Sequence, residues 1–398
     1  MQYSTLSSDQ MTAVGPVVFE VRSLWRRLEA LSDRRHRQGK RYPLPLILLF
    51  VVLAKLCGED RPSGIAEWVR HRREQLGRAL GMKLARVPHH NTYRRVLAGA
   101  VCPEELDRAI GAFLQESPQA GLEVLISIDG KTIRGTVDAQ DPEGLKLLVA
   151  CLPQKGIALL QVALDPHTNE ISAAPVLLAG LDLEGKIVTA DALHTQRALS
   201  TQVLEAGGQY LWLVKDNQPA LRADIEELFS GDDRTVEGGR LGHDFARAQQ
   251  VDKGHGRRER RRITVSGELK GYSDWPGLEQ VFQLERERVQ SKTGKHEHEI
   301  VYGVTSLTAD QASPERLLEL TRAYWGVENG LHYRRDVTFR EDATRLTQGQ
   351  AGHVMASLNN LVIGLLRLAG FTNLAAARRY CAAHLAYALA LLTSSPQT

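Results

Sequence analysis

The spacing of apolar residues changes near residue 120, and with it the kind of secondary structure that the sequence predicts. Before that point apolar residues recur at helical spacing, with charged residues on the other faces. After it come short runs of β-branched and aliphatic residues, which glycine and polar turns separate. The pattern therefore predicts a helical region followed by an α/β region.

The helical region is expected to be compact and to contain a fully buried helix. Residues 45–58 are almost entirely apolar, but they are too few to span a bilayer and Lys55 interrupts them. We therefore expect a core helix there and no membrane contact. Three further helices are expected at residues 18–31, 63–80 and 89–99, the last of them capped by Asn91 or Thr92.

Basic residues in the helical region allow more than one interpretation. Residues 33–44 hold a dense run of cations, which either contacts phosphate or forms a solvated linker. The helix at residues 89–99 could belong to a helix-turn-helix motif whose recognition element carries Tyr93, Arg94 and Arg95. No spacing in this region establishes DNA binding, so these interpretations stay open.

The order of elements after residue 123 predicts an α/β fold with an RNase-H-like mixed sheet and flanking helices. Three strands joined by hairpins are followed by a strand, a helix and another strand. Residues 153–156, with the sequence PQKG, are expected to form one of the hairpin turns. The expected strands are residues 124–129, 146–152, 157–164, 185–191 and 210–214.

A basic and mostly β segment is expected to be inserted into this fold, because residues 281–289 and 299–307 alternate like strands. Beyond it, helices are expected from residue 314, over 351–370 and near 380–392. We therefore divide the chain into an N-terminal helical domain at 1–120, which is possibly DNA-binding, the first part of the α/β domain at 121–232, the β-rich insertion at 233–300, and the second part of the α/β domain at 301–398.

Composition adds constraints on location and partners. The net charge is only +3, so any nucleic-acid contact must come from a local basic surface. The four cysteines are scattered and form no CxxC pair, which fits a reducing compartment and gives no zinc or redox motif. The first residues lack the pattern of a signal peptide. We expect a cytoplasmic protein that associates with the nucleoid when it is bound to DNA.

Acidic residues stand at three positions where apolar ones would fit the pattern. Asp129 and Asp191 end apolar strand runs, and Glu328 lies on an expected helical face with His332 and Arg335. Taken alone, Asp129 is either a turn residue beside a glycine or a metal ligand. Glu328 alone fits an ordinary partly buried helix with intrahelical charge pairs.

Together the three carboxylates indicate a different chemistry. Carboxylates that converge repel one another unless a cation neutralises them. Mg²⁺ prefers oxygen ligands and keeps some water, so two or three carboxylates plus phosphate oxygens suit it, with Mn²⁺ as a substitute. Two such ions support in-line displacement at phosphorus. We therefore expect Asp129, Asp191 and Glu328 to be the catalytic residues and metal ligands of a phosphodiester-cleaving site.

Positive charge is concentrated in a segment of the insertion that also contains Gly254 and Gly256. Such a run is commonly a solvated face, but the two glycines would let the backbone approach a phosphate closely. We favour nucleic-acid contact. The candidate residues are Lys253, His255, Arg257, Arg258, Arg260 and Arg261, followed by Arg262.

Several motifs, in order, resemble the H-repeat-associated type of DDE transposases from bacterial insertion sequences. The motifs are SIDGKTIRGT at 127–136, VTADALHTQ at 188–196, LVKDNQPAL at 213–221, DKGHGRRERR at 252–261 and YWGVENGLHYRRDVTFREDATR at 324–345. The resemblance implies an RNase-H-like core, an associated N-terminal helical domain, a divalent metal ion, and Asp129, Asp191 and Glu328 as the DDE triad. Asp336, Glu341 and Asp342 are rival acids near the glutamate.

The resemblance also implies DNA as the partner, in the form of terminal inverted repeats and target DNA held by a homodimer. Further candidate DNA contacts within or beside these motifs are Lys131, Arg134, His194, Lys215, Asn217, Arg322, Tyr324, Trp325, His332 and Arg335. Two alternatives remain open: an RNase-H-like metal-dependent nuclease without transposition, and a catalytically inactive DNA-binding protein. Metal-dependent cleavage of element-end DNA separates the three.

Overall fold

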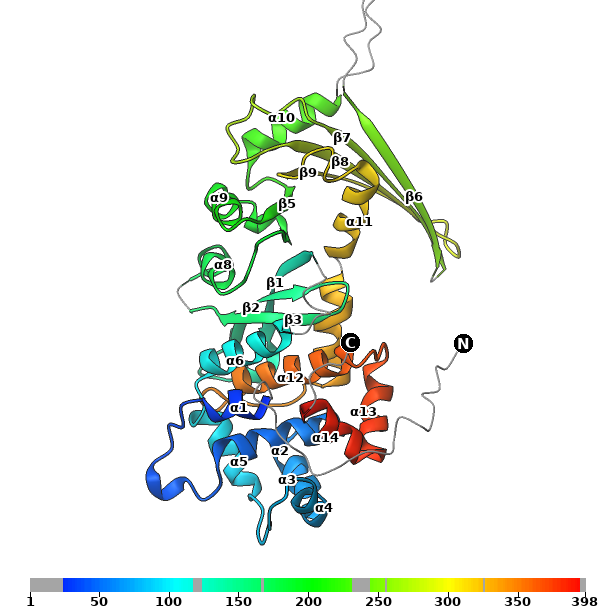
Figure 1. Cartoon of the computed structure of the whole chain (residues 1–398). Helices are drawn as coiled ribbons and strands as arrows, with labels where there is room; N and C mark the ends of the chain where they lie inside the picture. Colours follow the sequence, from blue (N-terminus) through cyan, green and yellow to red (C-terminus); the bar gives the residue numbers. More distant parts are fainter. Residues whose placement is uncertain are drawn as a thin grey trace, which may run out of the picture.

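The computed structural model describes residues 24–116, 124–165, 168–230, 244–254, 256–324 and 326–393, and all structural statements below refer to these residues (Figure 1). Helices form one end of the molecule, a mixed sheet crosses its middle, and long curved strands form the other end. No helix in these ranges is long and apolar enough to cross a membrane.

The helical end is built around α2, which is buried along its whole length. The apolar run predicted as a core helix is confirmed, and within it Lys55 is 1% exposed and pairs with Asp60 at 3.1 Å. Of the helix expected at 18–31, the described part is α1, and residues 1–23 lie outside the description. The helices here are α1 (Leu24–Glu29), α2 (Leu44–Leu56), α3 (Pro62–His71), α4 (Arg73–Ala79), α5 (His90–Gly99) and α6 (Pro103–Gln115).

Two local expectations for these helices are wrong. The single helix expected over 63–80 is two helices, because Arg72 has φ −106° and ψ 12° and leaves the helical path. Apolar periodicity continues across this break, so the pattern does not reveal it. The N-cap of α5 is His89, whose ring nitrogen accepts from the amide of Asn91, rather than Asn91 or Thr92.

The sheet has nine strands in the order β3-β2-β1-β4-β5-β9-β8-β7-β6. Its first five strands confirm the predicted RNase-H-like arrangement: β1 pairs antiparallel with β2 and parallel with β4, and β5 is parallel to β4. The PQKG turn between β2 and β3 is also confirmed. These strands are β1 (Leu125–Ile133), β2 (Leu145–Leu152), β3 (Ile157–Ala163), β4 (Ile187–Ala190) and β5 (Gln209–Val214).

Alternate residues of β2 face two different helical layers. Leu147, Val149 and Cys151 belong to the core shared with the helical end, whereas Leu148 and Ala150 belong to the core of the opposite layer. This is the period of two that an internal strand requires when both faces are buried. The opposite layer contains α8 (Glu170–Ala179), which the sequence reasoning missed, α9 (Arg197–Glu205) and α10 (Pro219–Ser230).

The β-rich segment extends the same sheet rather than forming a separate one. β9 pairs antiparallel with β5 and runs past residue 300, and β8, β7 and β6 follow as antiparallel neighbours. The strands predicted at 281–289 and 299–307 are confirmed with small shifts of their ends. Their bounds are β6 (Ala246–Gly254), β7 (Arg257–Ser266), β8 (Gln280–Gln290) and β9 (His296–Thr305).

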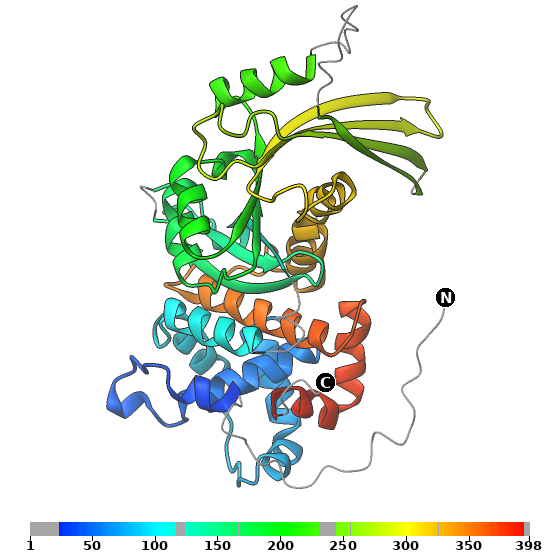
Figure 2. The same ribbon diagram turned by 45° about the horizontal axis from the view of Figure 1, so that its top comes forward.

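The last part of the chain returns from the sheet to the helical end. α12 lies beside α6, between the strands and the N-terminal helices, and nearly all of its residues are buried (Figure 2). α11 is followed not by a continuous α-helix but by two π-helical turns, η5 and η6. The elements are α11 (Pro314–Tyr324), η5 (Glu328–His332), η6 (Arg334–Thr338), α12 (Ala351–Leu368), α13 (Leu374–Ala383) and α14 (Leu385–Thr393).

Candidate active site

Asp129 and Asp191 lie side by side on neighbouring parallel strands. In the register of β1 and β4, Ile128 pairs with Ala190, and each aspartate is the residue that follows this pair along the chain. β4 ends at Ala190, whereas β1 continues to Ile133 and pairs Asp129 with Val149 of β2. The turn interpretation of Asp129 is therefore wrong, because the aspartate and the glycine after it are strand residues.

The surroundings of Asp191 favour its neutral form. Burial raises the pKa of this carboxyl, and the negative charges of Glu170 and Asp129 raise it further, while His194 partly opposes them. The amide of Leu193 donates to Oδ1 of Asp191 at 3.1 Å, which fixes the carboxylate at the start of the short 3-10 turn Ala192–His194. Carboxylates arranged in this way need a positive charge between them.

Glu170 is a fourth acidic residue at this place, and the sequence reasoning missed it. It is the first residue of α8, which begins with a capping box formed by Asn169 and Ser172. A Cβ added to Gly130 would lie 2.1 Å from Oε1 of Glu170, so the carboxylate rests on the backbone beside Asp129. Asn169, a favoured N-cap residue, followed by the acidic Glu170 in the first turn, is the sequence signal that could have found this helix start.

Two histidines lie against the carboxylates. Nε2 of His332 is 3.0 Å from Oδ2 of Asp129, and Nε2 of His194 is 3.4 Å from Glu170 and 3.9 Å from Asp191. Neither ring makes a hydrogen bond with a described group, so these are close nitrogen–oxygen contacts. His194 is 1% exposed, which places it beneath the site rather than on a DNA-facing surface.

Glu328 is placed here through its backbone, since its side chain lies outside the described residues. The residue begins η5, and His332 in the same turn reaches Asp129. The turn packs on the β2–β3 hairpin, because a Cβ on Gly326 would lie 2.6 Å from the carbonyl oxygen of Pro153. Gly156 has φ +65°, and a Cβ added there would lie 2.9 Å from the carbonyl oxygen of Gly330. Both glycines therefore permit this close approach.

The single helical face expected for Glu328, His332 and Arg335 does not form. A π-helical turn holds more residues than an α-helical turn, so residues three and four apart no longer stack. His332 reaches Asp129, whereas Arg335 is 0% exposed and its Nε donates to Oε2 of Glu341 at 2.9 Å. A DNA contact by Arg335 is therefore not supported.

The rival acids each have a partner of their own. Glu341 is buried with Arg335 and accepts from Asn359 at 2.7 Å. Asp336 pairs with the ammonium group of Lys131 at 2.6 Å. Asp342 accepts from the backbone amide of Arg134 at 3.1 Å. These contacts fasten η6 and the segment after it to the end of β1.

The motif after β5 holds the loop that follows β4. The side-chain amide of Asn217 donates to the carbonyl oxygen of Ala192 at 2.6 Å, and that of Gln218 donates to Thr195 at 2.8 Å. Asn217 thus fixes the turn that begins at Asp191. Lys215, at the end of the same strand, is exposed.

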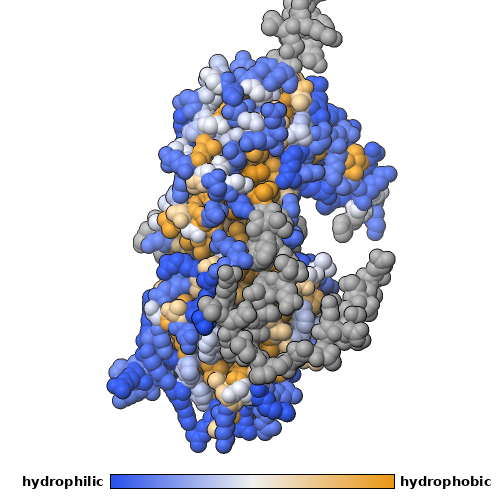
Figure 3. Space-filling model, in the orientation of Figure 1, coloured by the Kyte–Doolittle hydropathy of each residue, from blue (hydrophilic) through white to orange (hydrophobic). Residues whose placement is uncertain are grey.

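The arginine-rich strand β7 is largely neutralised by acids on its neighbours. Arg260 pairs with Glu287 at 2.7 Å, and Arg261 pairs with Asp252 at 2.9 Å and Glu259 at 2.7 Å. Hydrophilic side chains cover most of the end of the molecule that β6–β9 and α10 form (Figure 3). The remaining ion pairs of this group are Arg262–Glu285 at 3.5 Å, Arg257–Glu259 at 3.8 Å and Arg322–Asp252 at 3.1 Å.

The remaining candidate DNA contacts near β6, β7 and α11 differ in their exposure. Lys253 and Arg258 are exposed and form no ion pair with any described acid. Tyr324 is the last residue of α11 and is partly buried. His255 and Trp325 lie outside the described residues.

The donor set beside β1 and β4 fits a hard divalent cation. Asp129, Asp191 and Glu170 supply carboxylate oxygens, and within the described ranges no lysine or arginine forms an ion pair with them. Their partly exposed side chains leave an open side for water and for phosphate oxygens. Oxygen ligands with open positions are what Mg²⁺ and Mn²⁺ use in two-metal sites.

Comparison with known proteins gives one consistent result. Residues 120–365 match the family described as "Transposase DDE domain", and residues 25–114 match the family described as "DDE_Tnp_1-associated". Both matches fall on the parts described above: the helical end, and the sheet with the helices that pack on it.

Individual relatives agree with these matches. The chain is 28% identical to "Putative transposase YncI" of Escherichia coli O157:H7, over 87% of this chain and 88% of that protein. It is 27% identical to "H repeat-associated putative transposase YhhI" of Escherichia coli K12, over 87% and 91%. It is 33% identical to an "Uncharacterized protein in dhlA 3'region" of Xanthobacter autotrophicus, over 71% and 94%.

Proposed function

The chain belongs to the transposase DDE domain family, and we propose that it cuts and rejoins DNA at the ends of an insertion sequence through Asp129, Asp191 and Glu328. As a DDE transposase it binds DNA and depends on a divalent metal ion for strand cleavage and transfer. The observation that carries the residue assignment is the register that makes Asp129 and Asp191 neighbours on β1 and β4.

In this proposal Asp129 and Asp191 hold Mg²⁺, for which Mn²⁺ substitutes, and Glu328 completes the site. When bound, the ions neutralise the carboxylates, activate the attacking oxygen and stabilise the leaving one. The chain's own residues position these ligands. Asn217 holds the turn after Asp191 through the carbonyl oxygen of Ala192.

DNA is proposed to reach the site from the side on which these carboxylates are partly exposed. Candidate backbone contacts are exposed cations that follow β1 and β5 or lie on β6, β7 and α11. They are Arg134, Lys215, Lys253, Arg257, Arg258 and Arg322. Contacts of this kind position the duplex without reading its sequence. His332 lies against Asp129 and would act there, whereas Lys131 is held by Asp336.

The proposed substrates are the terminal inverted repeats of the element and its target DNA, held by a homodimer. The proposed location is the bacterial cytoplasm, on the nucleoid when DNA is bound. We further propose that residues 1–120 form a DNA-binding helical domain, that 121–232 and 301–398 form the catalytic domain, and that 233–300 form its insertion.

Mapping of cleavage products on the inverted repeats that flank the coding sequence tests the proposal. Purified protein is incubated with labelled duplexes that span each repeat, in Mg²⁺, Mn²⁺ or a chelator. We expect metal-dependent cuts at the repeat ends and joined products with a target duplex. Asp129→Asn should abolish both, whereas Glu143→Gln, which changes an exposed acid paired with Lys146, should not.

Two results would point elsewhere. Metal-dependent cleavage without preference for the repeats and without joined products would indicate a nuclease. Binding without cleavage under any metal would indicate a DNA-binding protein with a silent site.

A further inference from the structure

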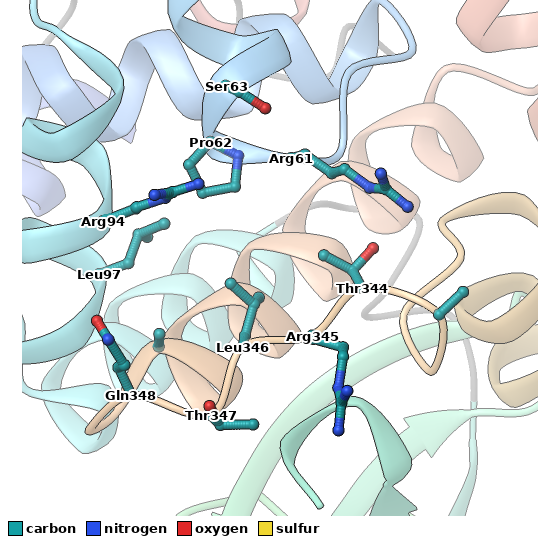
Figure 4. Close-up of a pocket in the computed structure, with 12 residues that line it drawn as sticks. Arg61, Pro62, Ser63, Arg94, Leu97, Thr344, Arg345, Leu346, Thr347 and Gln348 are labelled. Atoms are coloured by element: carbon teal, nitrogen blue, oxygen red, sulfur yellow. The ribbon is translucent and has the colours of Figure 1, made fainter. Parts of the chain in front are cut away.

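A groove of about 590 Å³ lies where the helical end meets the segment that leads into α12 (Figure 4). Pro62 and Arg94 lie on one side of it, on α3 and α5, and Thr344, Leu346 and Gln348 lie on the other (Figure 4). The groove thus lies between the parts of the chain that match two different families.

Three exposed arginines line this groove, one from each of three segments: Arg61, Arg94 and Arg345. None of them forms an ion pair or side-chain hydrogen bond with any residue that the structure describes. The arginines of β7 differ, since acids on neighbouring strands neutralise most of them. An unpaired cation in a groove is available to an external anion.

The groove is also polar and preformed. Ser63, Thr347 and Gln348 add hydroxyl and amide groups to its lining, while Leu97 adds an apolar floor. Its two sides are tied together, because the amide of Gln350 donates to the carbonyl oxygen of Ala98 at 3.0 Å. Gly349 has φ +53°, and a Cβ there would lie 2.3 Å from the same oxygen, so the approach requires glycine.

The same segment also connects the groove with the candidate active site. The amide of Leu346 donates to the carbonyl oxygen of Gly135 at 3.0 Å, and Gly135 follows β1, which carries Asp129. The chain between Asp129 and Gly135 spans at most about 20 Å at ~3.3 Å per residue. The groove therefore lies at most about six base-pair rises of ~3.4 Å beyond Asp129 along a duplex axis, if the duplex follows this direction.

We propose that this groove, through Arg61, Arg94 and Arg345, binds the phosphate backbone of duplex DNA a few nucleotides from the bond that is cut. Planar guanidinium groups with several donors suit phosphate oxygens. The inference rests on the proposed function, because it takes the DNA held at Asp129 as the same duplex. In this proposal the helical end holds the backbone of that duplex in a fixed position.

Salt-dependent DNA binding tests the groove. Each phosphate contact contributes about −0.9 to the slope of log affinity against log salt concentration. The full-length triple variant Arg61→Ala, Arg94→Ala, Arg345→Ala should therefore flatten the slope by roughly two to three units, for element-end and unrelated duplexes alike. The lysine triple variant at the same positions should keep most of the slope.

A matched control removes the same charge elsewhere. Arg26, Arg78 and Arg108 are exposed on helices α1, α4 and α6 and do not line the groove. Replacing them with alanine should leave the slope near that of the unchanged protein. Thermal melting and Mn²⁺ binding of both triple variants should match the unchanged protein, because the substituted side chains are on the surface.

Scanning the duplex with neutral methylphosphonates locates the contact. We expect the unchanged protein to lose affinity at phosphates within about six nucleotides of the cut, and the alanine triple variant to be insensitive there. An unchanged salt slope in a folded triple variant would overturn the inference. A second result would also overturn it: a nucleoside triphosphate or inorganic phosphate protects the groove arginines, but the triple variant binds DNA like the unchanged protein.

The two proposals fail in different ways. If the unchanged protein cuts repeat ends but the triple variant keeps its salt slope, only the groove inference fails. If the unchanged protein binds and cuts no DNA, the proposed function fails as well.

Discussion

Nε2 of His332 lies 3.0 Å from Oδ2 of Asp129, which joins the π-helical turn η5 to strand β1. The turn begins with Glu328, so this contact ties the segment that carries Glu328 to the strand that carries Asp129. The π-helical winding brings the histidine to the aspartate and buries Arg335, which stands three residues later.

His332→Ala should lower the cleavage rate while leaving the fold intact. Loss of the contact frees η5 from β1, and a displacement of about 1 Å at a reacting group can cost about 10²-fold in rate. Single-turnover cleavage under saturating DNA measures this effect. Tyr333→Ala is the matched control, because that neighbouring side chain is 50% exposed. Equal rates for both variants would contradict a positioning role for His332.

Asp129→Asn should abolish cleavage and leave the metal-free protein as stable as before, or slightly more stable. The negative charges of Asp129 and Glu170 both raise the pKa of Asp191, so removal of one charge relieves repulsion. Asp138→Asn provides the contrast, because Asp138 accepts from the amides of Gln140 and Asp141 in a loop. Thermal melting in a chelator, together with cleavage assays, compares them. A fall in melting temperature for Asp129→Asn would indicate a structural aspartate.

Glu170→Gln should weaken divalent-metal binding at the site several-fold without loss of folding. The side chain is at a helix N-terminus and rests on Gly130, so its amide substitute fits the same space. Gly130→Ala should act in the same direction, since its Cβ would displace the carboxylate. Titration with Mn²⁺ followed by electron paramagnetic resonance measures free metal. Unchanged affinity in both variants would show that Glu170 takes no part in metal binding.

Glu341→Gln should destabilise the protein by about 3–5 kcal/mol, because it leaves the buried Arg335 without its counter-charge. Burial by itself raises the pKa of Glu341, but Arg335 and the hydrogen bond from Asn359 outweigh it and hold that pKa below its ordinary value. A carboxyl with a lowered pKa stabilises the fold above its unfolded-state pKa, and this stabilisation is lost as the pH falls through the folded-state pKa.

Denaturant melts of the two proteins across pH check this sign. The difference between them should be full at neutral pH and should shrink once the pH falls below the ordinary value of 4.5. Replacing both Arg335 and Glu341 with apolar residues should recover much of the loss, since no unpaired charge then remains. A difference that grows on acidification would contradict the assignment.

Replacing Arg257, Arg258, Arg260 and Arg261 with alanine should flatten the salt slope of DNA binding by no more than about two units, because only Arg257 and Arg258 are proposed to contact phosphate. From the sequence alone, a flattening of roughly two to four units would be expected if most of them contacted phosphate. In the structure Arg260 and Arg261 are held by Glu287, Glu259 and Asp252. The variant should also melt earlier, because these cross-strand pairs are lost. A loss of three units or more would show that the arginines leave their partners for DNA.

The local pattern of apolar residues was sufficient to predict the order of strands β1–β5 along the chain and to single out Asp129 and Asp191. The apolar runs before Asp129 and Asp191 specify internal strands wherever they fold, and short connections leave few ways to pair them. The register of β1 with β4 then follows from burial on both faces. For these elements the information lies within a few residues of each position.

Other features depended on partners far away in the sequence. Glu170 joins the site because α8 packs over Gly130, forty residues earlier in the chain. The arginines of β7 are neutralised by β6 and β8, and their own spacing carries no sign of that pairing. Arg335 became a core residue because η5 and η6 wind as π-helical turns, which helical periodicity does not reveal.

The sequence by itself thus determined which segments become the central strands and most of the helices, and which acids follow their apolar runs, because hydrophobic spacing and local propensity act over a few residues. The tertiary structure decided which charges are satisfied inside the protein and which remain for DNA. An ion pair forms only when two distant segments are brought within a few ångströms, as for Arg260 and Glu287 at 2.7 Å. Arg61, Arg94 and Arg345 have no such partner among the described residues, and only the folded chain brings them together in one groove.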